Sequence, residues 1–322
     1  MRQLRIEAKG NINNWLSYRY RQRLNRSNDS SGNIDNLPTS IDIAGIGVKL
    51  GKGFSIFAGK QCTAYGGIEF DLNPIEIYEY SDMIENMSNF MTGLNIGYDI
   101  NAHQQLNLQI LDSRNGSFNK TYGVETEDGE QPTIESGKLP LVYTLNWNGN
   151  FNDIFKTRWS ASIMNEAKDK NLYYFAFGNE LNLNKFNMFL DFMYSKEGID
   201  RKGIMTGITG SMEGHNAFDA GYFSMVTKLN YRFLPKWNAF VKGMYETASL
   251  TKQQGDLEKG KYRTAWGYFA GVEFYPMDTN LHFFLTYVGR SYDFTARAKA
   301  LGQENYSTNR VSVGFIYQLP MF

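Results

Sequence analysis

Polar and apolar residues alternate along almost the whole chain, and this period of two constrains the fold more than any other feature. Leu106, Leu108 and Ile110, for example, alternate with Gln and Asn side chains. Such alternation is typical of β-strands with one apolar and one polar face, and helical periodicity of any length is nearly absent. The fifteen strands expected from this pattern cover residues 2–9, 12–25, 40–50, 53–65, 88–100, 104–114, 139–149, 154–165, 172–183, 186–196, 218–233, 237–249, 262–275, 280–292 and 306–319.

The connections between these strands alternate between two kinds. The short ones lie near residues 51–53, 101–103, 150–153, 184–185, 234–236 and 277–279. The others are mostly long and polar, at residues 27–38, 67–87, 115–138, 200–216, 251–260 and 295–304, with 168–170 as the one short member. Short turns at one end and long loops at the other predict an all-β, antiparallel transmembrane β-barrel that forms a single domain over residues 1–322.

The aromatic residues favour the same fold. They make up 15% of the chain, and Trp15, Trp147, Trp159 and Trp237 all lie within a few residues of an expected short turn. An interfacial belt of aromatic side chains would sit at that level of a membrane barrel. The alternative is that these tryptophans form the core of a soluble β-sandwich.

The number of strands raises a question about the N-terminus. Bacterial single-chain barrels have an even number of strands, which places both termini on the periplasmic side. We therefore expect sixteen strands in the intact protein, with the first strand preceding Met1. The chain begins without the apolar segment of a secretory signal, which agrees with this expectation. An odd-numbered barrel is the alternative. The terminal Phe322, on an amphipathic last strand, is typical of an outer-membrane insertion signal.

Composition excludes several other classes of protein. The 33 basic and 33 acidic residues cancel, which argues against a nucleic-acid-binding protein. No run of about 18 apolar residues is present, so a bundle of transmembrane helices is excluded. One cysteine and three dispersed histidines give no metal-ligand spacing, and we expect no metal and no cofactor.

Arg19, Arg21 and Arg23 share one face of the second expected strand. Tyr18 and Tyr20 alternate with them and would face lipid, where a guanidinium costs about 2–4 kcal/mol at the bilayer midplane. The arginines are therefore expected to line the lumen as a ladder that hands an anion along by charge-assisted hydrogen bonds. In the alternative interpretation they only pair with carboxylates and stiffen the wall. The same alternation places Arg158 and Arg232 in the lumen.

Residues 67–87 differ from the other long loops. The segment is rich in Ile, Tyr and Leu and has no Lys or Arg. Its carboxylates are Glu69, Asp71, Glu76, Glu79, Asp82 and Glu85. We interpret it as an inward constriction loop, whose acids oppose the wall arginines and create a transverse field. A short helix that caps the barrel mouth is the alternative.

Two segments carry a resemblance to a known family. Residues 13–24, which contain the three arginines, and residues 57–70 resemble the phosphate-selective porin O and P family, in particular the outer-membrane porins of Bacteroides-like bacteria. The resemblance implies a sixteen-stranded homotrimeric channel with an arginine ladder that leads to a basic constriction. Residues 67–87 lack the lysines of phosphate-specific members, and Lys60, the nearest base, is counted with the pore-lining residues. A general or weakly selective porin is therefore predicted.

The predicted function is passive diffusion of small hydrophilic solutes, anions among them, across the outer membrane of a Gram-negative bacterium. The expected partners are membrane lipid, the solutes and two further copies of the chain. A structural or adhesive barrel is the first alternative. A barrel enzyme is the second, although His103, His215 and His282 have no evident Ser or Asp partner.

Overall fold

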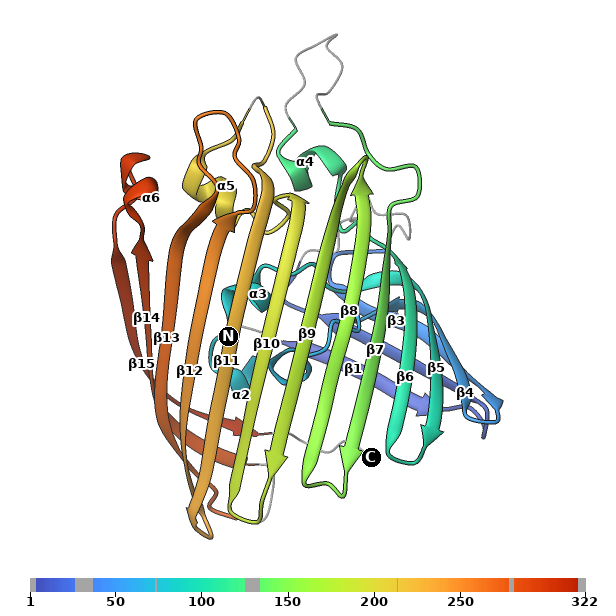
Figure 1. Cartoon of the computed structure of the whole chain (residues 1–322). Coiled ribbons are helices and arrows are strands. Elements are labelled where there is room, and N and C mark those ends of the chain that lie inside the picture. Colours follow the sequence, from blue (N-terminus) through green and yellow to red (C-terminus); the bar gives the residue numbers. More distant parts are fainter. Residues whose placement is uncertain are drawn as a thin grey trace.

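The structure is a computed structural model, which describes residues 4–26, 37–72, 74–124, 134–212, 214–277 and 281–317. Fifteen strands form one antiparallel sheet in which each strand pairs with its neighbours in sequence (Figure 1). Their bounds are β1 Arg5–Asn11, β2 Leu16–Arg23, β3 Ile41–Gly51, β4 Phe54–Gln61, β5 Met91–Asn101, β6 Gln104–Asp112, β7 Leu141–Phe151, β8 Phe155–Ala167, β9 Lys170–Asn182, β10 Phe186–Ile199, β11 Phe218–Leu234, β12 Trp237–Leu250, β13 Gly260–Phe274, β14 Leu281–Phe294 and β15 Tyr306–Tyr317. The predicted all-β fold and strand order are confirmed.

The helices are short and lie in the long connections. Three follow β4, at α1 Ile68–Asp71, α2 Pro74–Ile77 and α3 Asp82–Glu85, and three lie in later loops, at α4 Phe118–Tyr122, α5 Ile204–Thr209 and α6 Ala296–Ala300. In Figure 1, α4, α5 and α6 lie at the long-loop end, whereas α2 and α3 lie at mid-height behind β9–β12. In the described part of the chain no helix has the length and apolarity to cross a membrane.

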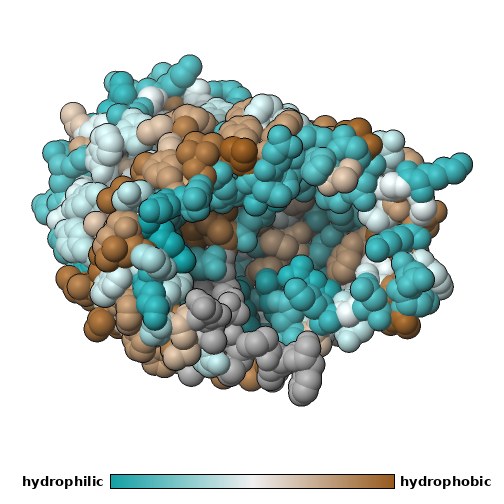
Figure 2. All heavy atoms as spheres, turned by 90° about the horizontal axis from the view of Figure 1, so that it is seen from below, coloured by the Kyte–Doolittle hydropathy of each residue, from teal (hydrophilic) through white to brown (hydrophobic). Residues whose placement is uncertain are grey.

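The apolar faces of the strands point outward. Viewed from the short-turn end, hydrophilic residues surround a central hollow, and hydrophobic residues lie on the outer wall (Figure 2). Trp147 of β7 pairs with Trp159 of β8, and their rings meet edge to face with centroids 5.0 Å apart on this outer face. Trp15, Trp159 and Trp237 are all exposed, as an interfacial belt requires.

The first and last strands leave two open edges. Within the described residues β1 and β15 do not pair with each other. Both are odd-numbered in an antiparallel sheet, so they run in the same direction, and one antiparallel strand would fit between them. The sixteenth strand stays a prediction, and Phe322 lies outside the described residues.

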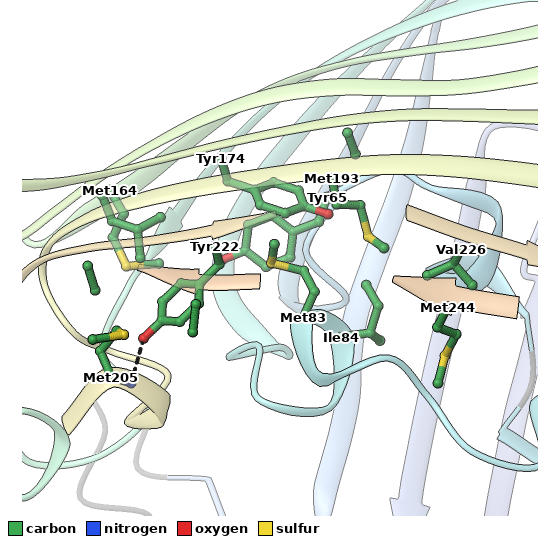
Figure 3. Close-up of a cluster of buried hydrophobic side chains, with 14 of the residues drawn as sticks. Tyr65, Met83, Ile84, Met164, Tyr174, Met193, Met205, Tyr222, Val226 and Met244 are labelled. Atoms are coloured by element: carbon green, nitrogen blue, oxygen red, sulfur yellow. Dashed lines mark hydrogen bonds between the residues drawn. The ribbon is translucent and has the colours of Figure 1, made fainter. Parts of the chain in front are cut away.

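The interior differs from the expected uniformly polar lumen. Met83 and Ile84 of α3 pack among inward-facing wall residues such as Tyr174, Met193 and Met244 (Figure 3). All five side chains are at most 8% exposed. The strands β8–β13 therefore carry apolar residues on both faces, because their inner face packs against residues 67–87 and not against water. We call this region the packed half of the lumen.

Candidate functional site: an arginine-lined path through the lumen

Strand register places the three arginines of β2 beside charged residues of β1. Arg19, Arg21 and Arg23 pair across the sheet with Lys9, Glu7 and Arg5. Side chains directly opposite in an antiparallel pair lie on the same face of the sheet, so all six share the inner face. Five of these six residues are bases and one, Glu7, is an acid, so positive charge accumulates on this wall.

Asp42 of β3 is the carboxylate on which these arginines converge. It is 2% exposed, and Arg23 Nε donates to both of its oxygens at 2.9 Å. Arg21 Nε lies 3.4 Å and Arg5 Nε 3.7 Å from Asp42 Oδ2, and neither of these two nitrogens has a hydrogen-bond partner. Three guanidinium groups thus share one carboxylate, which leaves an excess of positive charge.

A β-bulge brings Asp42 to this position. Arg21 pairs with Ile43, but the next residue of β2, Gln22, pairs with Ile41. The extra residue, Asp42, is left out of the regular ladder, which breaks the alternation of faces at this point. A carboxylate in the lipid-facing phase of the strand would be costly, and the bulge avoids that cost.

Phe90 supports the upper two arginines of the ladder. Its ring centroid lies 5.0 Å from Arg21 Cζ and 5.5 Å from Arg23 Cζ, within cation–π range. Phe90 has a φ of 63°, which is uncommon for a bulky residue. Its backbone N–H donates to its neighbour Asn89 Oδ1 at 2.8 Å, and this local bond helps to hold the conformation.

Two connected cavities follow the ladder. The first, which we call the arginine cavity, has a volume of about 680 Å³ and is lined by Arg5, Arg19, Arg21, Arg23 and Arg26 together with Phe90, Asp71 and Glu85. The second, which we call the amide cavity, has a volume of about 650 Å³ and is lined by Lys9, Arg19, Gln61, Asn95 and Gln109 among others. Arg19, Ile43 and Cys62 line both cavities, so the two meet at these residues.

The carboxylates of residues 67–87 divide between the two halves of the lumen. Asp71 and Glu85 line the arginine cavity, and Asp71 Oδ2 accepts from Arg158 Nε at 3.0 Å. Glu76 instead lines a cavity of about 430 Å³ at the short-turn end. Glu69, Glu79 and Asp82 make ion pairs with the wall.

Buried ion pairs hold this segment to the packed half. Lys242 Nζ lies 2.6 Å from Glu69 Oε1, and both side chains are fully buried. The same Nζ donates to the backbone carbonyl of Glu79 at 2.7 Å. Arg290 bridges Asp82 of α3 and Glu246 of β12, with both contacts at 2.9 Å. In each of these contacts a buried charge meets an opposite one, which offsets the cost of removing both from water.

The start of α1 is fixed by the opposite wall. Asp191 of β10 is fully buried, and its two carboxylate oxygens accept from the backbone N–H groups of Ile68 and Glu69 at 2.9 and 2.7 Å. These N–H groups lie in the first turn of the helix, where they have no intrahelical acceptor. A helix that caps the mouth was the alternative interpretation of residues 67–87, and the segment instead contains short helices, the first of which is tied to the inner wall.

The remaining predicted bases lie apart from the ladder. Arg232 lines the cavity at the short-turn end, with its Cζ 4.7 Å from the Tyr275 ring centroid. The prediction that Lys60 lines the pore is corrected by the strand register. Lys60 pairs with Ala44, and Ala44 pairs with Tyr20, so these three side chains share one face of the sheet. Lys60 is therefore buried on the face opposite to the arginines and does not line their path.

Asp42, Phe90 and Asn95 were missed by reasoning from the sequence. The alternation assigns Asp42 to the lipid face, and a charged residue in that phase is the one signal that a bulge was needed. Phe90 and Asn95 carried no comparable signal. Among the residues that the structure describes, no group of three or more His, Cys, Asp or Glu is arranged to hold a metal ion.

Comparison with known proteins gives the family. The model of the family described as phosphate-selective porin O and P matches residues 1–319. Similar solved structures include the outer membrane channel DcaP of Acinetobacter baumannii, with a TM-score of 0.62, 11% identity and coverage of 97% of this chain and 83% of that one. A trimer form of the outer membrane protein OmpT of Vibrio cholerae gives a TM-score of 0.52, 11% identity and coverage of 97% and 88%.

The OmpF structure of Salmonella typhi, in complex with daunomycin, gives a TM-score of 0.54 at 13% identity and covers 98% of this chain and 89% of its own. No curated protein matches the chain. These likenesses to solved structures show the fold, and the family match extends over nearly the whole chain. The chain belongs to the phosphate-selective porin O and P family and is a Gram-negative outer-membrane porin through which small hydrophilic solutes diffuse passively.

Proposed function

We propose that the porin prefers anions and that they pass along the ladder of β2. The observation that carries this proposal is the convergence of Arg5, Arg21 and Arg23 on the single carboxylate of Asp42. The excess of guanidinium groups attracts anions into the arginine cavity, and their unshared N–H groups offer charge-assisted hydrogen bonds to a passing solute. Transfer from Arg23 to Arg19 then leads into the amide cavity.

Residues 67–87 form the constriction in this proposal. They fill the packed half, and the arginine-lined path runs beside them along the wall of β1 and β2. Asp71 and Glu85 line the arginine cavity opposite this wall and supply negative charge across it. The resulting transverse field favours polar solutes over apolar ones, because an apolar solute gains nothing to offset the loss of ordered water.

Reversal potentials in planar bilayers under a KCl gradient test the proposal. The wild-type channel is expected to pass chloride more readily than potassium. Arg21→Glu replaces a positive charge in the arginine cavity by a negative one and should lower the chloride-to-potassium permeability ratio about fivefold at moderate salt. Lys52→Glu makes the same change of charge in the exposed turn between β3 and β4 and should leave the ratio unchanged.

Each other outcome contradicts part of the proposal. An unchanged ratio in Arg21→Glu removes the ladder from the selectivity mechanism. A barrel that carries no steady current would instead favour a structural or adhesive role. Catalysis has less support: in the described part of the chain no histidine is bonded to a serine or carboxylate, and His215 Nδ1 contacts the carbonyl of Asn216.

We also propose that the outer face of β1–β4 lies against a second copy in a homotrimer. β1, β2 and β4 have 7, 8 and 8 residues, whereas β8–β14 have 13 to 17. A tilted strand needs about 9–11 residues to cross the hydrocarbon core, so three of the four strands of this arc, all except β3 with its 11 residues, fall short of that length. The trimer form of OmpT shows that this fold allows threefold assembly.

The mass of the detergent-solubilised porin, measured by light scattering after size-exclusion chromatography, tests this assembly. Three copies are expected in each particle. A single copy that conducts at full level would contradict the homotrimer.

A further inference from the structure

A further cavity lies between residues 78–85 and the strands β14 and β15. We call it the aromatic cavity, because the residues that line its volume of about 890 Å³ include Tyr78, Tyr80, Phe284 and Tyr292. This volume is in the range of about 300–1,000 Å³ that is typical of cavities for small-molecule ligands. Tyr80 and Glu85 also line the arginine cavity, so the two cavities adjoin at these residues.

The aromatic residues of this cavity hold one another in place. The Tyr78 ring stacks on Phe240 of β12 with centroids 4.9 Å apart, and it meets the Phe284 ring edge to face at 5.2 Å. Tyr292 of β14 stacks on Tyr306 of β15 at 4.6 Å. Tyr78, Phe284 and Tyr292 are nevertheless only partly buried, so each leaves some surface open to a solute. The face of an aromatic ring is electron-rich and attracts the weakly positive C–H groups of a polar solute.

The charges that line the aromatic cavity are largely matched, unlike those of the arginine cavity. Glu79 Oε2 lies 3.2 Å from Arg310 Nη2, and Glu79 Oε1 lies 3.6 Å from Arg290 Nη1. Arg290 also pairs with Asp82 at 2.9 Å. The third carboxylate of the lining, Glu85, lies at the border with the arginine cavity, where bases are in excess. The aromatic cavity therefore has no strong attraction for an ion of either sign.

The ion pair of Glu79 and Arg310 remains within reach of a solute. The Glu79 side chain is 27% exposed and the Arg310 side chain is 42% exposed. Arg310 Nη2 also donates to the backbone carbonyl of Tyr78 at 3.2 Å. A guanidinium has several N–H groups, and each carboxylate oxygen accepts more than one hydrogen bond, so the pair keeps donors and acceptors for a solute. Both kinds of polar group thus lie beside the aromatic rings.

A solute that matches this cavity has no net charge, a face of C–H groups, and hydroxyl groups that both donate and accept hydrogen bonds. Cyclic sugars have all three properties, because their hydroxyl groups surround a ring whose faces carry C–H groups. We propose that the aromatic cavity binds uncharged sugars, with a ring face against aromatic residues such as Phe284 and with hydroxyl groups on Glu79 and Arg310. This site goes beyond the anion path, because the arginines of β2 do not select uncharged solutes.

Saturation-transfer difference NMR with maltose as the probe tests the site. The porin is solubilised in a detergent without a sugar head group, and empty micelles give the background. The wild-type porin should bind maltose saturably. Phe284→Leu keeps an apolar side chain but removes the ring, and it should raise the dissociation constant of maltose about fivefold. Arg310→Gln removes the guanidinium and should raise the same constant about threefold.

Phe186→Leu is the matched control, since Phe186 lines the separate cavity at the short-turn end. It should leave the dissociation constant at the wild-type value. Arg310→Gln changes a largely accessible side chain, so it keeps the site testable if Phe284→Leu does not fold. The absence of saturable maltose binding, or wild-type affinity in both Phe284→Leu and Arg310→Gln, overturns the inference. Binding is measured without an ion gradient, so its outcome is independent of the chloride preference.

Discussion

The packed half and the arginine-lined half of the lumen handle charge in opposite ways. In the packed half, Lys242, Arg263 and Arg290 face Glu69, Asp82 and Glu246, and each base has a carboxylate within 2.9 Å. In the arginine-lined half, Arg5, Arg21 and Arg23 share the single carboxylate of Asp42 among the residues that the structure describes. The first arrangement is neutral and rigid, and the second is positive and borders open space.

This difference shows how one barrel separates support from transport. Water is excluded from the packed half, so an unmatched charge there would carry a desolvation penalty of several kcal/mol. The arginine cavity is large enough to hold water, and an excess of charge costs less there while it attracts anions. We therefore expect substitutions in the packed half to change stability and those in the arginine-lined half to change selectivity.

Lys242→Met should have the largest effect. It leaves the fully buried carboxylate of Glu69 without its cation, and breaking a buried pair in this way costs about 3–5 kcal/mol. The thermal midpoint of the detergent-solubilised barrel, followed by circular dichroism, should fall. The double variant Glu69→Gln, Lys242→Met removes both charges and should recover most of the loss, whereas Lys52→Met, at an exposed turn, should change nothing. An unaltered midpoint in Lys242→Met would mean that the segment is held in place by packing alone.

Asp42→Asn should have a smaller effect, on selectivity. It removes the carboxylate that the three guanidinium groups share, while its amide oxygen can still accept one hydrogen bond. The chloride-to-potassium permeability ratio should rise about threefold. Glu246→Gln removes a carboxylate from the packed half and should leave this ratio unchanged. If both variants changed it equally, the two halves would not be electrically distinct.

Labelling of Cys62 should show the smallest effect, but it reports on one place, the junction of the two cavities. Cys62 lines both cavities and is the only cysteine of the sequence. Burial raises the pKa of its thiol to about 11, so labelling should be slow at pH 7. Below the pKa, each unit by which the pH is raised should accelerate labelling about tenfold, because only the thiolate reacts. An anionic methanethiosulfonate reagent should react about twice as fast as a cationic one, after each rate is divided by that for a small free thiol.

Cys62→Ser should abolish this labelling. Equal normalised rates for the two reagents would show that the positive field of the arginines does not reach the junction of the cavities.

The alternation of residues was sufficient to locate all fifteen strands, and the differences lie at their ends. The strand expected over residues 53–65 stops at Gln61, and the one expected from residue 88 begins at Met91. Both are shortened where the chain turns into the lumen, because backbone N–H groups such as those of Ile68, Glu69 and Met83 donate to wall carboxylates and not to a neighbouring strand. Sequence periodicity records the spacing within a strand, but it carries no record of contacts with distant strands.

The sequence by itself determined the barrel, the alternation of short turns and long loops, and the common face of Arg19, Arg21 and Arg23. These follow from the strict two-residue period of a strand beside lipid, where a misplaced charge is costly. Only the tertiary structure decided that Asp42 joins the arginines through a bulge, that Lys60 faces away from them and that residues 67–87 fill one half of the lumen. Those outcomes depend on register shifts and on pairings between residues more than a hundred positions apart, such as Glu69 with Lys242, which a local pattern cannot encode.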